Sequence, residues 1–359
     1  MSATSTMMLI GVGGAGCAMA DKVYRLFGED MRRLLIDTDA SSGIAGTPFV
    51  LLGAERYAGR GAGGEVTSAR TAAEDTVKLI EEHIGGVRLA VVVTALGGGT
   101  GTGATYEVIK HLGRLGIPSI AIATTPFSFE GEARHRNARG MVSMIADAAN
   151  ASIFMPLDKL VQHIDNMDLA MKSAVEAIAD AVTLFWRLVE KPGYIRLDVE
   201  RIRKTIQGAG RGRFMALTAT GPNRAAQIVE KAVSAPLLAD GTQQVRSILC
   251  GVLAGDDLRL SEIGKIADGI KTAFGSRADF ELATVNDEAH FGGKISVVAM
   301  MFEAVRKEEP QQKKSAGRRQ RMNKLVLTSS RFNNSEPTIW NGENLDVPTY
   351  IRQDINLEF

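Results

Sequence analysis

The chain has 359 residues, of which 45% are hydrophobic and 23% are charged, and its formal net charge is +1. This composition is typical of a globular protein with room for two domains, and it excludes a chain that is disordered throughout. The balanced charge provides no overall attraction to nucleic acid or to anionic membranes.

The cysteines and histidines predict neither a disulfide framework nor a metal site. Cys17 and Cys250 are far apart, and the five histidines are scattered along the chain. No apolar run reaches the roughly 18 residues that span a bilayer, and the N-terminus lacks the pattern of a signal peptide. We therefore expect a cytoplasmic protein without an integral membrane segment or a metal cluster.

Residues 7–167 alternate short apolar runs with helical patterns. The apolar runs predict buried strands at Met7–Val12, Arg33–Asp37, Leu89–Leu96, Ser119–Thr124 and Ser152–Met155. The helical patterns lie near residues 16–27, 68–83, 103–115 and 133–148. This alternation predicts an α/β, Rossmann-like domain whose parallel sheet is covered on both faces. Such sheets bind ligands at the carboxyl ends of their strands.

Residues 168–192 predict one long central helix. Apolar residues recur there every three or four positions, and Pro192-Gly193 ends the pattern. Residues 193–303 then predict a smaller α+β domain, because strands are more often adjacent. We expect strands at Phe214–Thr220, Ser247–Ala254, Phe280–Val285 and Ile295–Phe302, and helices near residues 222–234 and 260–274.

The chain changes character after residue 303. Residues 304–342 predict a basic linker, since Arg306–Lys324 carries eight Lys or Arg against two Glu and lacks periodicity. Within it, Leu325–Phe332 is the segment that resembles a short strand. Residues 343–359 contain an apolar and charged island, Leu345–Arg352, that is typical of a recognition peptide. No aromatic residues interleave with the charges of Arg306–Lys324, so we expect no sequence-specific nucleic-acid binding.

Three glycine-rich loops carry the chemistry of the sequence. Gly11–Gly16 follows the first strand and opens a helix, where glycines let backbone amides approach a phosphate. Gly97–Gly103 has five glycines in seven residues, which predicts a nest for a polyphosphate rather than a packing role. The third loop is Gly59–Gly64. The alternatives are a strand-helix turn without a ligand for the first loop and a mobile surface loop for the third.

The run Gly97–Gly103 matches the tubulin/FtsZ signature letter for letter, and the chain from Met8 to about Met301 resembles that superfamily. The resemblance implies GTP or GDP as the ligand, Mg²⁺ bound through the phosphates, and a head-to-tail homopolymer with the nucleotide between subunits. It implies that Asp37-Thr-Asp39 is the second nucleotide loop and that Gly59–Gly64 senses the terminal phosphate. The residues that it assigns to the nucleotide are Gly13, Gly14, Ala15, Gly16, Ala62, Gly63, Gly97, Gly98, Gly99, Thr100, Gly101, Thr102, Gly103, Glu130, Arg134 and Glu176.

Within that set, the resemblance implies that Glu130 and Arg134 hold the ribose and that Glu176 reads guanine. Cys17-Ala18 and Leu157 stand where FtsZ usually has polar residues near the nucleoside. The tail is similar to the FtsZ peptide that docks on membrane tethers. It therefore implies membrane-tethering or division proteins as partners through residues 343–353.

The loop after the central helix departs most from the family pattern. FtsZ has Asn-x-Asp-x-x-Asp there, which polarises the attacking water in the next subunit, whereas this chain has Arg196-Leu-Asp198-Val-Glu-Arg201. The candidate catalytic residues are thus Asp198, Arg196, Arg201 and Glu200. The arginines could hold an unhydrolysed triphosphate, or they could act as arginine fingers in trans while Asp198 or Glu200 orients water. Alternatively, the two carboxylates only stabilise the first turn of the following helix.

The function predicted from the sequence is a GTP-binding cytoskeletal protein that polymerises head to tail, in cell division or a related role. Loss of a water-orienting group typically slows a reaction by about 10²–10⁴-fold, so we expect slow hydrolysis. One rival is a non-polymerising, nucleotide-binding regulator of another FtsZ. The other is a Rossmann-type oxidoreductase, with Asp37 or Asp39 on a ribose, but that reading gives Gly97–Gly103 no role.

Overall fold

The computed structural model describes residues 6–28, 31–161, 166–207, 209–235, 245–304, 339–340 and 343–344. Most of the predicted linker, the strand expected at Leu325–Phe332 and the recognition peptide at Leu345–Arg352 lie outside the described residues. The described residues up to Ala304 belong to one compact unit. In a second unit, the strands Ile339–Trp340 (β11) and Glu343–Asn344 (β12) form an antiparallel pair.

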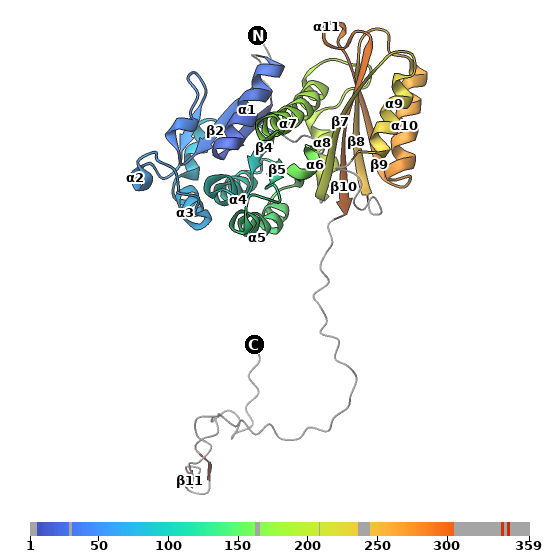
Figure 1. The fold of residues 1–359 in the computed structure, drawn as a ribbon. Coiled ribbons are helices and arrows are strands. Elements are labelled where there is room, and N and C mark those ends of the chain that lie inside the picture. The colour runs from blue at the N-terminus through green and yellow to red at the C-terminus, as the bar shows by residue number, and fades with distance from the viewer. Residues whose placement is uncertain are drawn as a thin grey trace. The chain divides into compact units, whose positions relative to one another are not determined.

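The N-terminal half is a parallel sheet with helices on both faces (Figure 1), as the sequence predicts. Its strands, in the spatial order β3-β2-β1-β4-β5-β6, are all parallel. They are β1 (Met7–Val12), β2 (Arg33–Asp37), β3 (Phe49–Leu51), β4 (Leu89–Ala95), β5 (Ser119–Thr125) and β6 (Ala151–Pro156). The helices are α1 (Gly13–Phe27), α2 (Ala54–Tyr57), α3 (Val66–Thr76), α4 (Gly99–Arg114), α5 (Glu132–Ala148) and α6 (Leu157–Leu160), with 3₁₀ turns η1 (Ala40–Ser42) and η2 (Val77–Glu82).

Strand alternation explains the two covered faces. Successive side chains of a strand point to opposite faces, and in β1 both sets are apolar. Met7 and Leu9 pack into the cluster that contains α1 and α7, whereas Met8 and Ile10 pack into the cluster that contains α3, α4 and α5. The continuous apolar runs of the sequence therefore reflect burial on both sides of the sheet.

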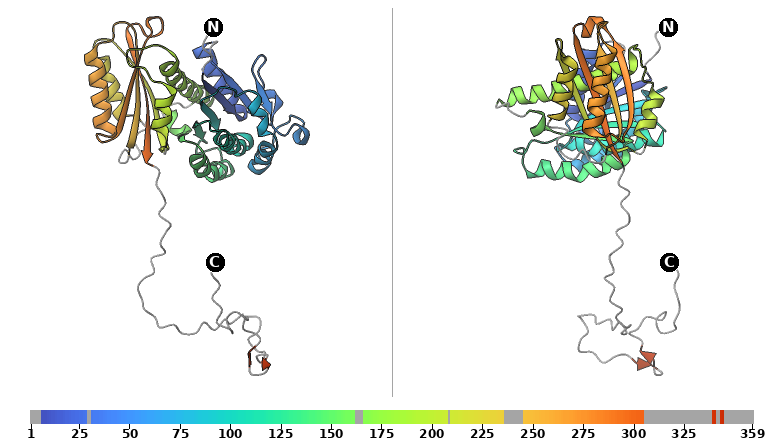
Figure 2. Two further views of the ribbon diagram at one scale, coloured as in Figure 1. Left: turned by 180° about the vertical axis from the view of Figure 1, so that it is seen from behind. Right: turned by 90° about the vertical axis from the view of Figure 1, so that its right-hand side faces the viewer.

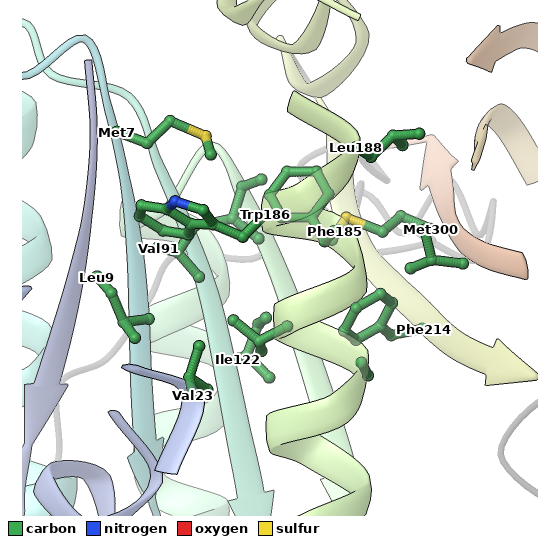
Figure 3. Packing of buried hydrophobic residues seen from close by; sticks show 14 of the residues in the cluster. Met7, Leu9, Val23, Val91, Ile122, Phe185, Trp186, Leu188, Phe214 and Met300 are labelled. Atoms are coloured by element: carbon green, nitrogen blue, oxygen red, sulfur yellow. The ribbon is translucent and has the colours of Figure 1, made fainter. Parts of the chain in front are cut away.

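The long helix α7 (Met167–Glu190) joins the two halves of the molecule. The side chain of Asn166 caps its first turn by accepting from a backbone N–H. Figure 3 shows the fully buried Phe185 and Trp186 of α7 between Met7 and Leu9 on one side and Met300 on the other. Removing a large core side chain of this kind costs about 3–5 kcal/mol, so the two halves are tied together through α7.

The C-terminal half extends the same sheet. Its elements are α8 (Val199–Ile206), β7 (Ala209–Thr220), α9 (Arg224–Val233), β8 (Val245–Ala254), α10 (Leu260–Phe274), β9 (Asp279–Asn286), α11 (Glu288–Phe291) and β10 (Lys294–Ala304). Strand β7 pairs in parallel with β6, then β10 pairs antiparallel with β7 and β8, and β9 closes the edge parallel to β8. Helices α9 and α10 cover the outer face of these strands (Figure 2).

The predicted fold class, a Rossmann-like domain joined by a long helix to a smaller α+β part, is confirmed. The ten strands, however, form one continuous sheet across both predicted domains. The short strand β3 was not predicted. Strand β7 begins at Ala209 rather than at Phe214, because its pairing with β10 continues through Gly212 to Ala209.

Candidate functional site

A cavity of about 430 Å³ opens where the carboxyl ends of β1, β2, β4 and β5 meet. This volume lies within the usual range for small-ligand sites. The cavity is bounded by all three glycine-rich loops and by the second loop at Asp37–Asp39. The topology thus brings together segments from Val12 to Met171, at the edge where a parallel sheet binds ligands.

The loops Gly11–Gly16 and Gly97–Gly103 contact each other within the cavity. Gly13 has φ +75°, and a Cβ atom there would lie 2.7 Å from the backbone nitrogen of Gly101. Glycine is therefore required for both the backbone conformation and the close approach. Because α1 begins at Gly13 and α4 at Gly99, the N-termini of two helices meet at this point. Their combined partial positive charge and free N–H groups suit an anion such as a polyphosphate.

The glycines divide into two kinds. Gly14, Gly98 and Gly63 line the cavity, and a Cβ on Gly98 or Gly63 would meet no protein atom within 4 Å. Gly16 and Gly103 do not line it. A Cβ on Gly16 would lie 2.5 Å from a carbonyl oxygen of β4, and one on Gly103 would collide with a carbonyl oxygen of α3. Part of the glycine signature thus serves close packing beneath the site, which the sequence interpretation did not allow.

Threonine hydroxyls hold the loops in register. The Oγ1 atoms of Thr38 and Thr100 lie 2.7 Å apart, and Thr38 Oγ1 also accepts from the backbone N–H of Ala62 at 3.0 Å. The buried Thr102 does not line the cavity, but its Oγ1 accepts from the N–H of Gly97 at 2.8 Å. The loops Asp37–Asp39 and Gly59–Gly64 are therefore coupled to the loop Gly97–Gly103 through specific hydrogen bonds.

Five charged side chains line the cavity. Three are carboxylates and two are guanidinium groups, so their net formal charge is −1: Asp37, Asp39, Glu130, Arg60 and Arg134. Asp37 is buried and accepts hydrogen bonds from the backbone N–H of Thr38 at 2.7 Å and from Ser42 Oγ at 2.5 Å. Hydrogen bonds from Ser41 lower the pKa of Asp39.

The thiol of Cys17 lies beneath the first loop and is not reactive. Burial, and next the charge of Asp37, raise the pKa of Cys17 to about 12. Its single S–H group can donate to the carbonyl oxygen of Gly11 or of Ile36, which lie 3.6 and 3.7 Å from Sγ. A thiol must be ionised to act as a nucleophile or metal ligand, so Cys17 has a packing role.

The segment Thr125–Gly131 forms a further side of the cavity, which Pro126 and Glu130 line. Glu130 accepts from the N–H of Phe127 at 2.9 Å and pairs with Arg134 at 2.6 Å. Both residues of the pair line the cavity, as do the apolar side chains of Leu157 and Met171. Met171 lies in the first turns of α7 and is partly exposed. This end of the cavity therefore combines a polar pair with an apolar platform, which suits a sugar and a base.

Glu176 does not line the cavity. It lies further along α7, where its carboxylate contacts Lys22 of α1 at 3.5 Å. Desolvation, followed by the nearby charge of Glu176, raises the pKa of Asp180, although Lys22 partly offsets this shift. The structure thus places an ion pair at the position expected to read guanine, and that assignment stays a prediction.

The candidate catalytic loop lies far from this cavity within the chain. Helix α7 has 24 residues and so spans about 36 Å; Met171 near its start lines the cavity, and the loop follows its end. Asp198 is the N-cap of α8, and its Oδ1 accepts from the N–H of Arg201 at 2.8 Å. Arg201 pairs with Glu281 at 3.7 Å. The structure therefore groups these residues at the opposite end of the molecule from the nucleotide loops.

Glu200 and Arg196 differ in how far their side chains are engaged. Burial opposes ionisation of Glu200, but hydrogen bonds and charges of Arg88 and Arg203 outweigh it and lower its pKa. Arg196 is exposed and has no ion pair or side-chain hydrogen bond within the described part of the chain. Of the four predicted catalytic residues, Arg196 is thus the one whose side chain has no ion pair or hydrogen bond to a described residue.

Sequence reasoning did not single out several residues that line the cavity: Ser42, Arg60, Thr124 and Met171. Arg60 stands between two glycines of the third loop, which was a signal that could have been used. Among the described residues there is no group of three or more His, Cys, Asp or Glu that could hold a metal ion. No helix in the described ranges is long and apolar enough to cross a bilayer.

Comparison with known proteins identifies the same two parts of the chain. Residues 6–165 match the GTPase domain of the Tubulin/FtsZ family, and residues 212–303 match the C-terminal domain of the FtsZ family. The chain is 29% identical to cell division protein FtsZ 2 of Rhizobium meliloti, over 84% of this chain and 89% of that protein. It is 30% identical to FtsZ of Pseudomonas aeruginosa, over 82% and 77%. An FtsZ dimer structure from M. jannaschii superposes with a TM-score of 0.77 at 25% identity, covering 82% of this chain and 87% of that one.

Proposed function

The chain belongs to the tubulin/FtsZ family, and from this premise we propose that it is a GTP-binding cytoskeletal protein whose copies assemble head to tail. The observation that carries the proposal is the meeting of the α1 and α4 N-termini at Gly13 and Gly101, in a cavity of about 430 Å³. The Rossmann-type oxidoreductase gains no support, since the Gly97–Gly103 loop forms part of the same cavity.

We propose one orientation for a guanosine nucleotide in this cavity. The backbone N–H groups at Gly13–Ala15 and Gly98–Thr100 would hold phosphates, and the pair Glu130–Arg134 would hold the ribose. Leu157 and Met171 would contact the base. The lining side chains are net negative, so a Mg²⁺ ion carried by the phosphates would supply charge that the protein does not.

Head-to-tail assembly would unite the two ends of α7. The side chains of Phe129, Leu169 and Met171 at the cavity end are 64%, 53% and 41% exposed, and Tyr194 at the opposite end is 74% exposed. Adjacent exposed apolar residues are a feature of contact surfaces, and Tyr194 is followed by Ile195, which is also exposed. Stacking one subunit on the next would cover them and would bring the loop at Tyr194–Arg201 over the cavity of its neighbour.

We infer that hydrolysis in such an interface is slow. Asp198 is engaged as a helix cap, and Glu200 is engaged by two arginines. A general base must reach the water that it activates. The contacts of Asp198 Oδ1 and Glu200 Oε1 hold both carboxylates at the start of α8 and limit how far either can extend toward a water. Arg196 would instead place a positive charge beside the terminal phosphate, which stabilises the bound triphosphate as well as the transition state.

One experiment tests the proposal. The purified protein is incubated with GTP, GDP, ATP or a slowly hydrolysed GTP analogue, and pelleting and phosphate release are followed together. We expect polymer with GTP and the analogue, little with GDP or ATP, and slow phosphate release. Tight GTP binding without polymer at any protein concentration would favour the non-polymerising regulator. Binding of neither GTP nor GDP would refute the assignment of the cavity.

A further inference from the structure

We propose that Arg60 is the residue by which this chain distinguishes a nucleoside triphosphate from a diphosphate in its own cavity. The inference rests on the proposed function and deepens it, since it names one side chain for the terminal phosphate. It does not require assembly, because Arg60 and the phosphate loops belong to the same subunit.

The charges of the cavity favour Arg60. A nucleoside triphosphate brings several negative charges into a cavity whose lining side chains already sum to −1. The other lining cation, Arg134, is paired with Glu130 at 2.6 Å. Arg60 is exposed and makes no side-chain ion pair or hydrogen bond to any residue that the structure describes. Of the two lining guanidinium groups, it is therefore the one available to pair with a ligand.

The backbone at Arg60 is fixed although its side chain is free. The flanking residues Gly59 and Gly61 have φ +72° and +80°, a region that favours glycine. The backbone N–H of Arg60 donates to the carbonyl oxygen of Tyr57 at 3.0 Å. The N–H of Gly61 donates to the carbonyl oxygen of Thr38 at 3.1 Å. Such preorganisation lowers the entropy cost of forming a contact with the ligand.

The loop of Arg60 lies beside the phosphate loop rather than beside the base. Two residues after Arg60, the N–H of Ala62 donates to Thr38 Oγ1, which contacts Thr100 at the start of α4. A Cβ on Gly99 would lie 2.9 Å from the backbone of Gly64, at the end of the same loop. The ribose pair and the apolar platform form the other end of the cavity. A phosphate chain that runs from there across α4 therefore ends at the loop that carries Arg60.

The test compares GTP with GDP in the unassembled protein. Arg60→Met removes the charge and keeps much of the side-chain volume, and affinities are measured by calorimetry below the assembly concentration. Hydrogen bonds to charged groups lead us to expect GTP affinity to fall about 10- to 100-fold, with GDP affinity changed by less than about threefold. Arg60→Lys, which keeps a point charge but not the planar fork, should fall between the two. The matched control is Arg56→Met in α2, because Arg56 is exposed and does not line the cavity.

The outcomes separate this inference from the proposed function. A selective loss of GTP affinity, with GDP affinity kept and Arg56→Met unaffected, supports the role of Arg60. An equal loss for both nucleotides, or no loss for either, would overturn it while leaving the nucleotide site in place. A wild-type protein that binds neither nucleotide would overturn the proposed function and this inference with it.

Discussion

Two glycine-to-alanine substitutions in one loop should separate ligand binding from folding. Gly98 lines the cavity with φ −79°, and an added Cβ would meet no protein atom within 4 Å. Gly103 lies five residues further along, does not line the cavity, and has no room for a Cβ against the backbone of α3. We therefore expect Gly98→Ala to affect the nucleotide and Gly103→Ala to affect the fold.

The expected magnitudes follow from these environments. Gly98→Ala loses some unfolded-state entropy, which stabilises, and replaces a favourable N-cap residue, which destabilises, so its apo stability should stay within about 1 kcal/mol of wild type. Gly103→Ala must push α3 from α4, and overpacking of this kind costs about 1–3 kcal/mol. Ligand at 100 times the Kd stabilises by about 2.7 kcal/mol, whereas a tenfold weaker site gains only about 1.4 kcal/mol at the same concentration.

The assay is urea unfolding with and without GDP, which avoids assembly driven by triphosphate. Gly98→Ala should show normal stability without ligand and a GDP increment smaller by at least about 1 kcal/mol. Gly103→Ala should show the reverse, with a lower baseline and an increment close to that of wild type. If Gly98→Ala kept the full GDP increment, the phosphate would not lie over Gly98 and the orientation proposed for the nucleotide would be wrong.

Four further predictions concern other parts of the chain. Arg224→Met should cost about 3–5 kcal/mol in urea unfolding, because it removes the two hydrogen bonds, of 2.8 and 3.0 Å, that Arg224 donates to the largely buried Glu262. The double variant Arg224→Met/Glu262→Gln should recover most of this loss. The hydrogen bonds of Arg224 outweigh burial and lower the pKa of Glu262. The stabilisation of the folded state by ionised Glu262 is therefore present above the unfolded-state pKa of about 4.3 and is lost as the pH falls below it. This loss should be larger in wild type than in Arg224→Met. Arg196→Asn should raise steady-state phosphate release by about tenfold, part of the gain expected from a water-positioning group, whereas a decrease would mean that Arg196 acts as a finger in trans. Deleting residues 343–359 should leave pelleting with GTP intact and remove recruitment to a membrane-tethering partner, and loss of pelleting would place the tail within the assembling body.

Long, regular elements could be predicted from the sequence. The expected central helix at 168–192 corresponds to α7, because its apolar period is sustained over many turns and both a cap and Pro192-Gly193 mark its ends. Short or glycine-rich elements could not. Strand β3 has only three residues, and α1 and α4 begin inside the glycine runs at Gly13 and Gly99, where side-chain patterns give no helix signal.

The site could be predicted as a set of loops but not as a set of contacts. The glycine runs identified which segments form the cavity. Which glycine faces the ligand depends on neighbours far away in sequence, as Gly13 against Gly101 and Gly103 against α3 illustrate. Likewise, the sequence predicts the same role for Arg196 and Arg201. Only the structure distinguishes them, because Arg201 forms an ion pair with Glu281.

The separation of the cavity and the loop by α7 sets how nucleotide and assembly can be linked. From Met171, which lines the cavity, to the end of α7 the helix runs about 29 Å. No side chain of the loop at Tyr194–Arg201 can therefore act on the nucleotide of its own subunit. Chemistry that needs this loop would therefore occur only between subunits of the proposed assembly. In this chain one oxygen of each loop carboxylate is held at the start of α8, and Arg196 has no side-chain partner among the described residues. We therefore expect contact with a neighbour to add positive charge at the terminal phosphate rather than a base. Assembly would then depend on whether a triphosphate or a diphosphate is bound, which Arg60 would distinguish within each subunit. It would depend less on the rate of hydrolysis.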